Sequence, residues 1–415
     1  MEAKMNTRKK TWGGAIGNVL EWYDFAIFGF LAPIMSPLFF PDSDPMVSLI
    51  KTYGVFAGGY LMRPIGGIFF GYIGDRFGRA RALQLSILMM AVPTLLIGFL
   101  PTYEQIGWLA ALLLIVMRLV QGVSVGGELV ASMAYLVENS PPEKRGVAGS
   151  WSLFGSVSGV LLGSLTMTLL DWLLSAEALT AWGWRVPFIG GLVIFALGVW
   201  LRRDISEGQA ECGVPVDKPS NPLREVLSKM PGRVLHISSA LMLFSSSFYV
   251  LFVWFPTYLT KILPVPISHA DEINLAGMTL LLASIFCFGS LSDRVGYKQV
   301  VLIGTAFITL AVYPLFVFVD HGSVGAALTA VLIFAIGCGA ILGPMPALLV
   351  SSFPPNVRSS AIGLSYNITL AIFGGTAPLV ATWFIDRTED LASPAIYLAL
   401  LGAISFYATI KLRSI

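Results

Sequence analysis

The chain carries little charge for its length. Of its 415 residues only 12% are Asp, Glu, Lys or Arg, whereas 56% are hydrophobic, and the mean hydropathy is +0.78. A soluble globular domain has about 25% charged residues, so this composition excludes that class and indicates an integral membrane protein. The formal net charge of only +2 gives no indication of a nucleic-acid partner.

Cysteine and histidine are also scarce, with three of each. Neither set has the spacing of metal ligands, and the cysteines do not suggest a disulfide scaffold. The chain offers no nucleophile and base at reachable spacing, and it lacks a Walker lysine, which argues against direct drive by ATP. The sequence therefore predicts no enzyme, no cofactor and no metal site.

Apolar segments long enough to cross a bilayer recur along the chain. They cover residues 12–40, 46–70, 82–100, 107–136, 147–170, 185–201, 234–259, 273–290, 299–319, 325–350, 360–385 and 394–411. We therefore expect an all-α protein with about twelve transmembrane helices. The widest polar stretch divides it into an N-terminal bundle over 1–201, a linker over 202–233 and a C-terminal bundle over 234–415. No cleavable leader is evident at the start, so the first helix is expected to be retained.

Lysine and arginine are distributed unevenly between the two expected sides of the membrane. One side collects most of them, including those of both termini and of the linker, whereas the other holds Arg185, Lys261, Arg387 and, by its position, Lys51. Loops rich in Lys and Arg face the cytoplasm. We therefore expect the N-terminus, the C-terminus and the linker to be cytoplasmic.

The two halves of the chain repeat a motif. The loop at 71–81, which contains Asp75, is echoed at 289–298, which contains Asp293, and the two aspartates lie 218 positions apart (293 − 75). Arg145 after the fourth span is echoed by Arg358 after the tenth, at an offset of 213 (358 − 145). Two echoes at nearly one offset indicate duplicated halves, a hallmark of secondary transporters.

These motifs resemble known signatures. The G-x-x-x-D-R-x-G-R loop, its second copy and Arg118-Leu119-Val120-Gln121-Gly122 resemble motifs of the major facilitator superfamily. Segments 17–25, 63–67, 121–128 and 182–188 resemble the metabolite:proton symporter family, which includes bacterial carriers of proline and betaine, 2-oxoglutarate, citrate and shikimate. The resemblance implies two pseudo-symmetric six-helix bundles in the bacterial inner membrane with a substrate site between them. We expect a monomer surrounded by the lipid bilayer.

The first apolar span carries a polar stripe. Asn18, Glu21 and Asp24 follow one another at intervals of three and so share one face of a helix. An ionised carboxylate that faces lipid costs several kcal/mol, so the stripe should face protein or a water-filled cavity. A pathway for protons or solute is the leading interpretation. The alternative is a structural carboxylate paired with a charge on a neighbouring helix.

The fourth span should meet this stripe, because Arg118, Gln121 and Glu128 share a face. Counting the rise from the cytoplasmic ends pairs Asp24 with Arg118, and either Glu21 or Glu128 with Arg63. Proton-coupled sugar porters have a similar Tyr-Asp in the first span and an Arg in the fourth. That resemblance implies that Asp24 carries the proton and Arg118 modulates it, while Glu21 and Glu128 remain alternatives.

The second half has no ionisable residue at the expected middle of the membrane. It offers neutral and aromatic side chains, which suit a quaternary ammonium or another cation but are equally typical of core packing. The predicted substrate contacts are Asp24, Arg118, Gln121, Tyr249, Trp254 and Asn367. We expect symport of a proton with a small polar metabolite, with a zwitterion such as proline or glycine betaine favoured. The alternatives are an organic anion such as 2-oxoglutarate or citrate, or a passive facilitator.

Charged residues at the cytoplasmic edge are expected to form a gate. In the superfamily the first-half loop closes this gate by contacts between the bundles, and the resemblance implies this role here. The predicted gating residues are Asp75, Arg76, Arg79, Arg145, Asp293 and Arg294. The second copy of the motif ends in Gly296-Tyr297-Lys298, a looser match.

If the loop closes the cytoplasmic gate, Asp75→Asn will weaken the closed state because it removes a charge that joins the bundles. We expect the protein to shift toward inward-facing states. A periplasmic thiol-labelling assay measures the shift, and unchanged labelling would contradict it.

Overall fold

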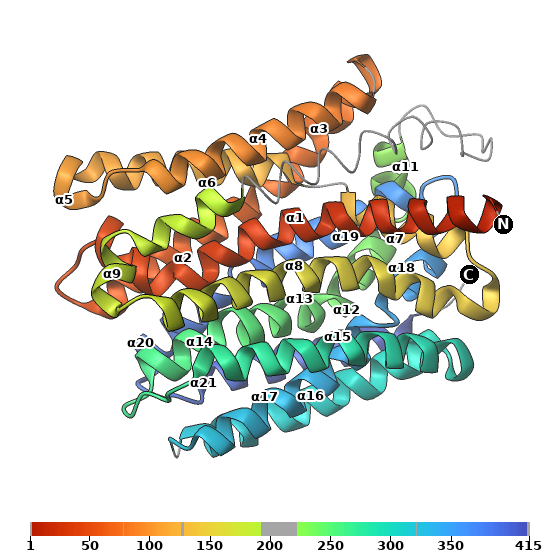
Figure 1. The fold of residues 1–415 in the computed structure, drawn as a ribbon. Helices are drawn as coiled ribbons and strands as arrows, with labels where there is room; N and C mark the ends of the chain where they lie inside the picture. The colour runs from red at the N-terminus through yellow and green to blue at the C-terminus, as the bar shows by residue number, and fades with distance from the viewer. Residues whose placement is uncertain (1, 78, 126–127, 192–221, 321, 413–415) are drawn as a thin grey trace.

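The computed structural model describes residues 2–77, 79–125, 128–191, 222–320 and 322–412. Every regular element in these ranges is a helix (Figure 1). Within them, nine helical stretches are long and apolar enough to cross a membrane. The sixth predicted span lies mostly outside the described residues, and in the third only Leu88–Phe99 forms an apolar stretch. The all-α membrane fold is confirmed, whereas the count of twelve is only partly covered.

The N-terminal half consists of long helices, two of which are interrupted. The elements are α1 (Glu2–Phe39), α2 (Pro45–Leu61), α3 (Arg63–Phe77), α4 (Arg79–Phe99), α5 (Tyr103–Ile106), α6 (Trp108–Ser124), α7 (Glu128–Glu138), η1 (Pro142–Lys144), α8 (Arg145–Leu173), α9 (Ala176–Ala181), η2 (Gly183–Arg185) and a helix described over 186–191. The predicted second span is thus two helices that meet at Met62, and the predicted fourth span ends one helix at Ser124 and resumes at Glu128.

The C-terminal half contains three π-helical segments within its spans. The elements are α11 (Pro222–Lys229), α12 (Pro231–Ala240), α13 (Met242–Phe248), η3 (Tyr249–Trp254), α14 (Phe255–Thr257), η4 (Tyr258–Ile262), α15 (Ala270–Val295), α16 (Tyr297–Asp320), α17 (Val324–Leu342), α18 (Met345–Ser351), α19 (Arg358–Thr369), η5 (Leu370–Gly374), α20 (Ala377–Thr388) and α21 (Ser393–Lys411). The π segments are η3, η4 and η5. Segment η3 begins at Tyr249, which hydrogen-bonds to Tyr60 of the other half. π-Helical turns are frequent at functional sites.

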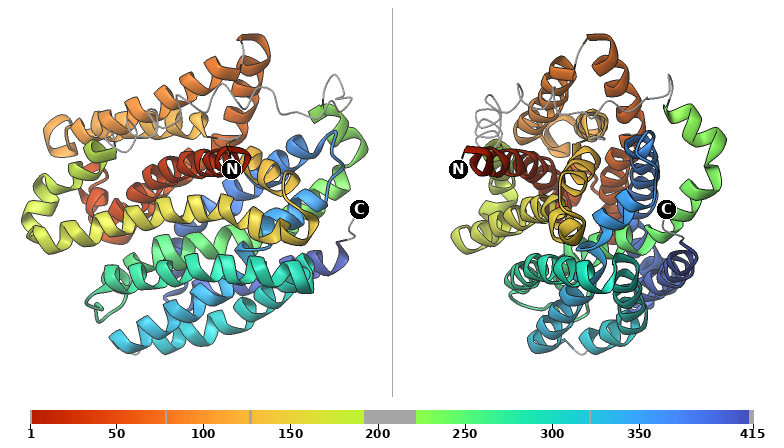
Figure 2. Two further views of the ribbon diagram at one scale, coloured as in Figure 1. Left: turned by 45° about the vertical axis from the view of Figure 1, so that its right-hand side comes forward. Right: turned by 90° about the vertical axis from the view of Figure 1, so that its right-hand side faces the viewer.

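The two halves form two bundles that lie side by side (Figure 2). Helices α1 to α9 occupy one side and α12 to α21 the other, and α8 packs along α15 at their junction. The start of α1 and the end of α21 lie at the same end of the molecule, called here the terminal end. That this end faces the cytoplasm stays a prediction, as do the domain boundaries at 201 and 233.

A close crossing of α2 and α6 positions the buried polar groups of the N-terminal bundle. A Cβ atom on Gly122 would lie 2.0 Å from the carbonyl oxygen of Gly59, so only glycine fits there. The crossing holds α6 against α2 just where α6 carries Arg118 and Gln121. Backbone contact of this kind is characteristic of small residues at helix interfaces in membranes.

We expect Gly122→Ala to destabilise the protein by about 1–3 kcal/mol, because the new methyl group forces the two helices apart. Thermal unfolding of the detergent-solubilised protein measures the effect as a lower Tm. Gly54→Ala in α2 is the matched control, because its new Cβ would meet no atom within 4 Å. An equal Tm for both variants would contradict the close-approach account.

Candidate functional site

The bundles are joined at the terminal end by a carboxylate that binds the start of a helix. Asp293, near the end of α15, accepts hydrogen bonds from the backbone N–H groups of Gly146 (2.6 Å) and Val147 (3.0 Å) at the start of α8. The first amides of a helix lack intrahelical partners, and the helix dipole favours an anion there. A second link is the ion pair of Arg358 with Glu138, whose N and O atoms are 2.5 Å apart. Both contacts close the terminal end.

Polar contacts also close the opposite end. The indole N–H of Trp172 in α8 donates to Glu272 in α15 (2.8 Å), and the hydroxyl of Tyr53 in α2 donates to Thr257 in α14 (3.0 Å). On the surface nearby, Lys51 donates to Asp42 at 2.6 Å and thereby lowers the pKa of that carboxyl. With both ends joined, the structure is an occluded state.

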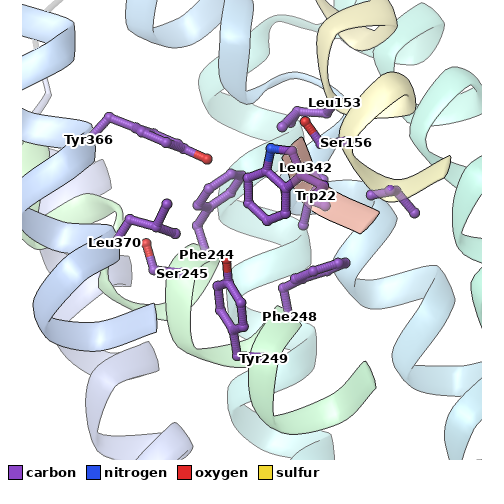
Figure 3. A pocket seen from close by; sticks show the side chains of 11 residues that line it. Trp22, Leu153, Ser156, Phe244, Ser245, Phe248, Tyr249, Leu342, Tyr366 and Leu370 are labelled. Atoms are coloured by element: carbon purple, nitrogen blue, oxygen red, sulfur yellow. The ribbon is translucent and has the colours of Figure 1, made fainter. Parts of the chain in front are cut away.

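A small cavity lies between the bundles. Its volume is about 20 Å³, enough for a single water molecule. The N-terminal bundle contributes Trp22, Leu153, Ser156 and Val157 to its wall. The C-terminal bundle contributes mainly Phe244, Ser245, Phe248, Tyr249 and Tyr366 (Figure 3). Because a site for a small organic molecule needs about 300 Å³ or more, a solute can occupy this place only when the bundles move apart.

A buried ion pair lies next to Trp22, which is one of the residues that line the cavity. A guanidinium nitrogen of Arg63 lies 2.9 Å from a carboxylate oxygen of Glu21, and both side chains are nearly inaccessible. The Arg63 guanidinium carbon is 5.5 Å from the ring centre of Trp22 and 4.8 Å from that of Tyr60. Tyr249 then donates a hydrogen bond to the Tyr60 hydroxyl across the interface (2.9 Å). The prediction that Arg63 pairs with Glu21 or Glu128 is thus met by Glu21.

Asp24 lies in a hydrogen-bonded network of neutral groups. One carboxylate oxygen accepts from the hydroxyl of Thr94 (2.8 Å) and the other from the amide of Gln121 (2.6 Å). Arg118 donates to the same Gln121 side chain (3.0 Å). The sequence paired Asp24 directly with Arg118, whereas the structure places Gln121 between them. Arg118 also lies 4.3 Å from the ring centre of Phe28.

The polar stripe of α1 faces protein, as the sequence predicts. Asn18, Glu21 and Asp24 are all buried, and the Asn18 amide donates to the carbonyl of Ser152 in α8 (3.3 Å). The stripe thus faces neighbouring helices, which supply its hydrogen-bond and ion-pair partners.

The other predicted site residues have mixed positions. Tyr249 lines the cavity. Trp254 instead donates to Thr382 within the C-terminal bundle (2.9 Å), and Asn367 is buried without lining the cavity. Arg145 is half-buried at the start of α8 and Arg294 is exposed. The side chains of Glu128, Asp75, Arg76 and Arg79 lie outside the described part of the chain.

The sequence analysis did not assign several residues that line the cavity to the site, among them Trp22, Phe244, Ser245, Phe248 and Tyr366. Trp22 follows Glu21 and so lies about 100° from the stripe. A hydrophobic residue next to a polar stripe gives no signal of its own. The part of the cavity wall that belongs to the C-terminal bundle depends on how α13 and α19 pack together. A local sequence pattern does not reveal this packing.

Two helical bundles that meet around a central cavity closed at both ends define a membrane transporter that works by alternating access. A family model of the Major Facilitator Superfamily matches residues 14–378 and 268–412. The chain belongs to this superfamily, whose members are transporters and not enzymes.

Relatives with known names are similar over nearly the whole chain. The glycine betaine/proline/ectoine/pipecolic acid transporter of Dickeya dadantii is 35% identical over 409 residues, which cover 96% of this chain and 81% of the relative. The proline/betaine transporter of Salmonella typhimurium is 32% identical over 417 residues, with 98% and 83% coverage. Among solved structures, a D-xylose–proton symporter superposes with a TM-score of 0.73 at 17% identity, covering 98% of this chain and 97% of that one. This last likeness shows the fold.

We expect Asp293→Ala to open the terminal end, because it removes two charge-assisted hydrogen bonds to the start of α8. A loss of about 1–2 kcal/mol changes the ratio of closed to open molecules by roughly 5- to 30-fold. A cysteine introduced at Ser156 in a cysteine-free background reports the change through its rate of labelling from that end. Glu143→Ala, which removes an exposed carboxylate of η1 near the same end, is the control. Equal labelling rates for the two variants would contradict the role of Asp293.

Proposed function

We propose that the protein is a secondary transporter that imports a small polar metabolite together with a proton. The observation that carries the proposal is the buried Asp24 carboxylate, which two neutral side chains bind while Arg118 is one hydrogen-bond partner away. An intramembrane carboxylate in such a network is typical of proton-coupled carriers. The occluded arrangement of the bundles supplies the alternating access that coupling requires.

The network suggests how a proton is taken up and released. Burial favours the neutral form of a carboxyl group, whereas a nearby guanidinium favours the ionised form. In this state Gln121 accepts a hydrogen bond from Arg118 and donates one to Asp24, so it links the two residues. If rocking of the bundles turns Gln121 aside, Arg118 approaches Asp24 directly and favours release of the proton. Asp24 is therefore the proposed proton carrier and Arg118 its modulator, with Glu21 and Glu128 as the alternatives.

Proline or glycine betaine is the proposed substrate. Two observations support it: the substrates for which the similar transporters are named, and the aromatic wall that the C-terminal bundle gives the cavity. An organic anion is the alternative, for which Arg63 next to Trp22 would be the partner. We further propose a monomer in the bacterial inner membrane, with the terminal end cytoplasmic.

A passive facilitator is the other candidate, because the Glu21–Arg63 ion pair is neutral as a unit and would serve packing alone. The two functions differ in whether substrate accumulates. Proteoliposomes with an imposed inward proton gradient distinguish them, since a facilitator brings its substrate only to equal concentrations on both sides.

The test of the coupling role is Asp24→Asn. We expect this variant to lose accumulation driven by the proton gradient, by about tenfold or more, because an amide cannot carry the proton. Exchange of labelled for unlabelled substrate should persist, since the bundles can still alternate. Asp42→Asn, at the surface, serves as the control. Undiminished accumulation in Asp24→Asn would overturn the assignment.

A further inference from the structure

The cavity between the bundles contains three buried polar groups without partners. The indole N–H of Trp22, the hydroxyl of Tyr366 and the hydroxyl of Ser245 make no hydrogen bond within the described part of the chain. Their residues are only 4%, 2% and 1% exposed. Leaving a buried polar group unpaired costs about 1–3 kcal/mol. Three such groups around one cavity point to a ligand that pairs with them.

These groups come from both bundles. Trp22 belongs to α1, Ser245 to α13 and Tyr366 to α19, and in Figure 3 the Tyr366 hydroxyl points toward Trp22. An indole N–H can only donate, and both hydroxyls can donate as well. The set therefore suits a ligand with closely spaced acceptors, above all a carboxylate. Such a ligand would also bridge the two bundles.

The remaining wall is aromatic. The ring of Trp22 is stacked with that of Tyr249 at 6.2 Å and meets that of Phe248 edge-on at 6.1 Å. Phe244 packs edge-on to Tyr366 at 6.0 Å. Aromatic faces attract organic cations, and such attraction is strongest where water is excluded. One ligand can thus place a carboxylate at the donors and a substituted ammonium against the rings.

Among the residues that the structure describes, no charged side chain lines the cavity. Arg63 lies near the ring of Trp22 and does not itself line the cavity. Its charge is already balanced by Glu21. A ligand with a net charge would enter this desolvated space uncompensated, which is costly. A zwitterion carries its own compensation. The wall composition therefore selects against di- and tricarboxylates.

We propose that Trp22, Tyr366 and Ser245 bind the carboxylate of a small zwitterion, and that Trp22, Phe248 and Tyr249 hold its substituted ammonium group. This inference rests on the proposed function and adds the residues that recognise each end of the substrate. The cavity widens to admit the ligand when the bundles separate and contracts around it when they close.

The test separates the two parts of the ligand. Glycine betaine has both a quaternary ammonium and a carboxylate, whereas choline has the ammonium without the carboxylate. We expect Trp22→Phe and Tyr366→Phe to weaken the binding of glycine betaine about tenfold each, because one hydrogen bond to a charged group is lost. Choline, which carries a net charge, should bind the unaltered protein more weakly than glycine betaine does. Its affinity should change little in these two variants, since an aromatic ring is kept. Phe248→Leu should weaken both ligands.

Equilibrium binding to the purified full chain in nanodiscs, without a proton gradient, gives these affinities. Trp184→Phe is the matched control, because Trp184 is buried with an unpaired indole N–H but lies away from the cavity. Equal loss of both ligands in Trp22→Phe, unchanged betaine affinity, or tighter binding of 2-oxoglutarate than of betaine would overturn the inference.

The same measurement is independent of proton coupling. Selective loss of betaine binding together with passive equilibration in proteoliposomes would uphold the inference and remove the proposed function. Proton-driven accumulation together with an unchanged ratio of betaine to choline affinity would uphold the function and remove the inference.

Discussion

The burial of two carboxylates on one helix is the constraint on which the rest of the structure depends. Glu21 and Asp24 cannot face lipid, so α1 must lie against helices that bring donors to them. Arg63 forms an ion pair with Glu21, whereas Thr94 and Gln121 donate hydrogen bonds to Asp24. The crossing of α2 and α6 at Gly59 and Gly122 is close enough to hold these partners around α1. The close packing of these helices and the pairing of the two buried carboxylates therefore depend on each other.

The interface between the bundles differs along its length. Charged and hydrogen-bonded contacts such as Asp293 with the start of α8 and Trp172 with Glu272 join its two ends. Its centre is aromatic, and polar groups of Trp22, Ser245 and Tyr366 there have no hydrogen-bond partner among the described residues. Polar contacts at an accessible end can be exchanged for water at low net cost, so either end can open. A ligand that forms hydrogen bonds with these polar groups of both bundles would therefore stabilise the closed arrangement.

The sequence predicts the buried stripe of α1, the pairing of Arg63 with either Glu21 or Glu128 and the membrane-spanning helical fold, because a charged side chain in an apolar helix must be paired or shielded from lipid. The structure shows that Glu21 is the partner. It does not predict that Gln121 stands between Arg118 and Asp24, since counting helical rise locates residues by depth and not by side-chain reach. It misses Trp22 for a similar reason, because only the packing of α13 and α19 makes its edge part of a cavity. The break at Met62 does have a signal in the sequence, because Pro64 lacks the N–H that would bond to the carbonyl of Tyr60. The prediction of one uninterrupted span over 46–70 overlooked it.

Coupling of solute entry to proton entry is the central claim, and the most direct measurement follows the proton itself. Purified protein in proteoliposomes without any imposed gradient would be given glycine betaine or proline while the external pH is recorded. The account predicts a substrate-dependent rise in external pH that a protonophore abolishes and that Asp24→Asn lacks. Uptake of either substrate with no change in external pH would contradict it.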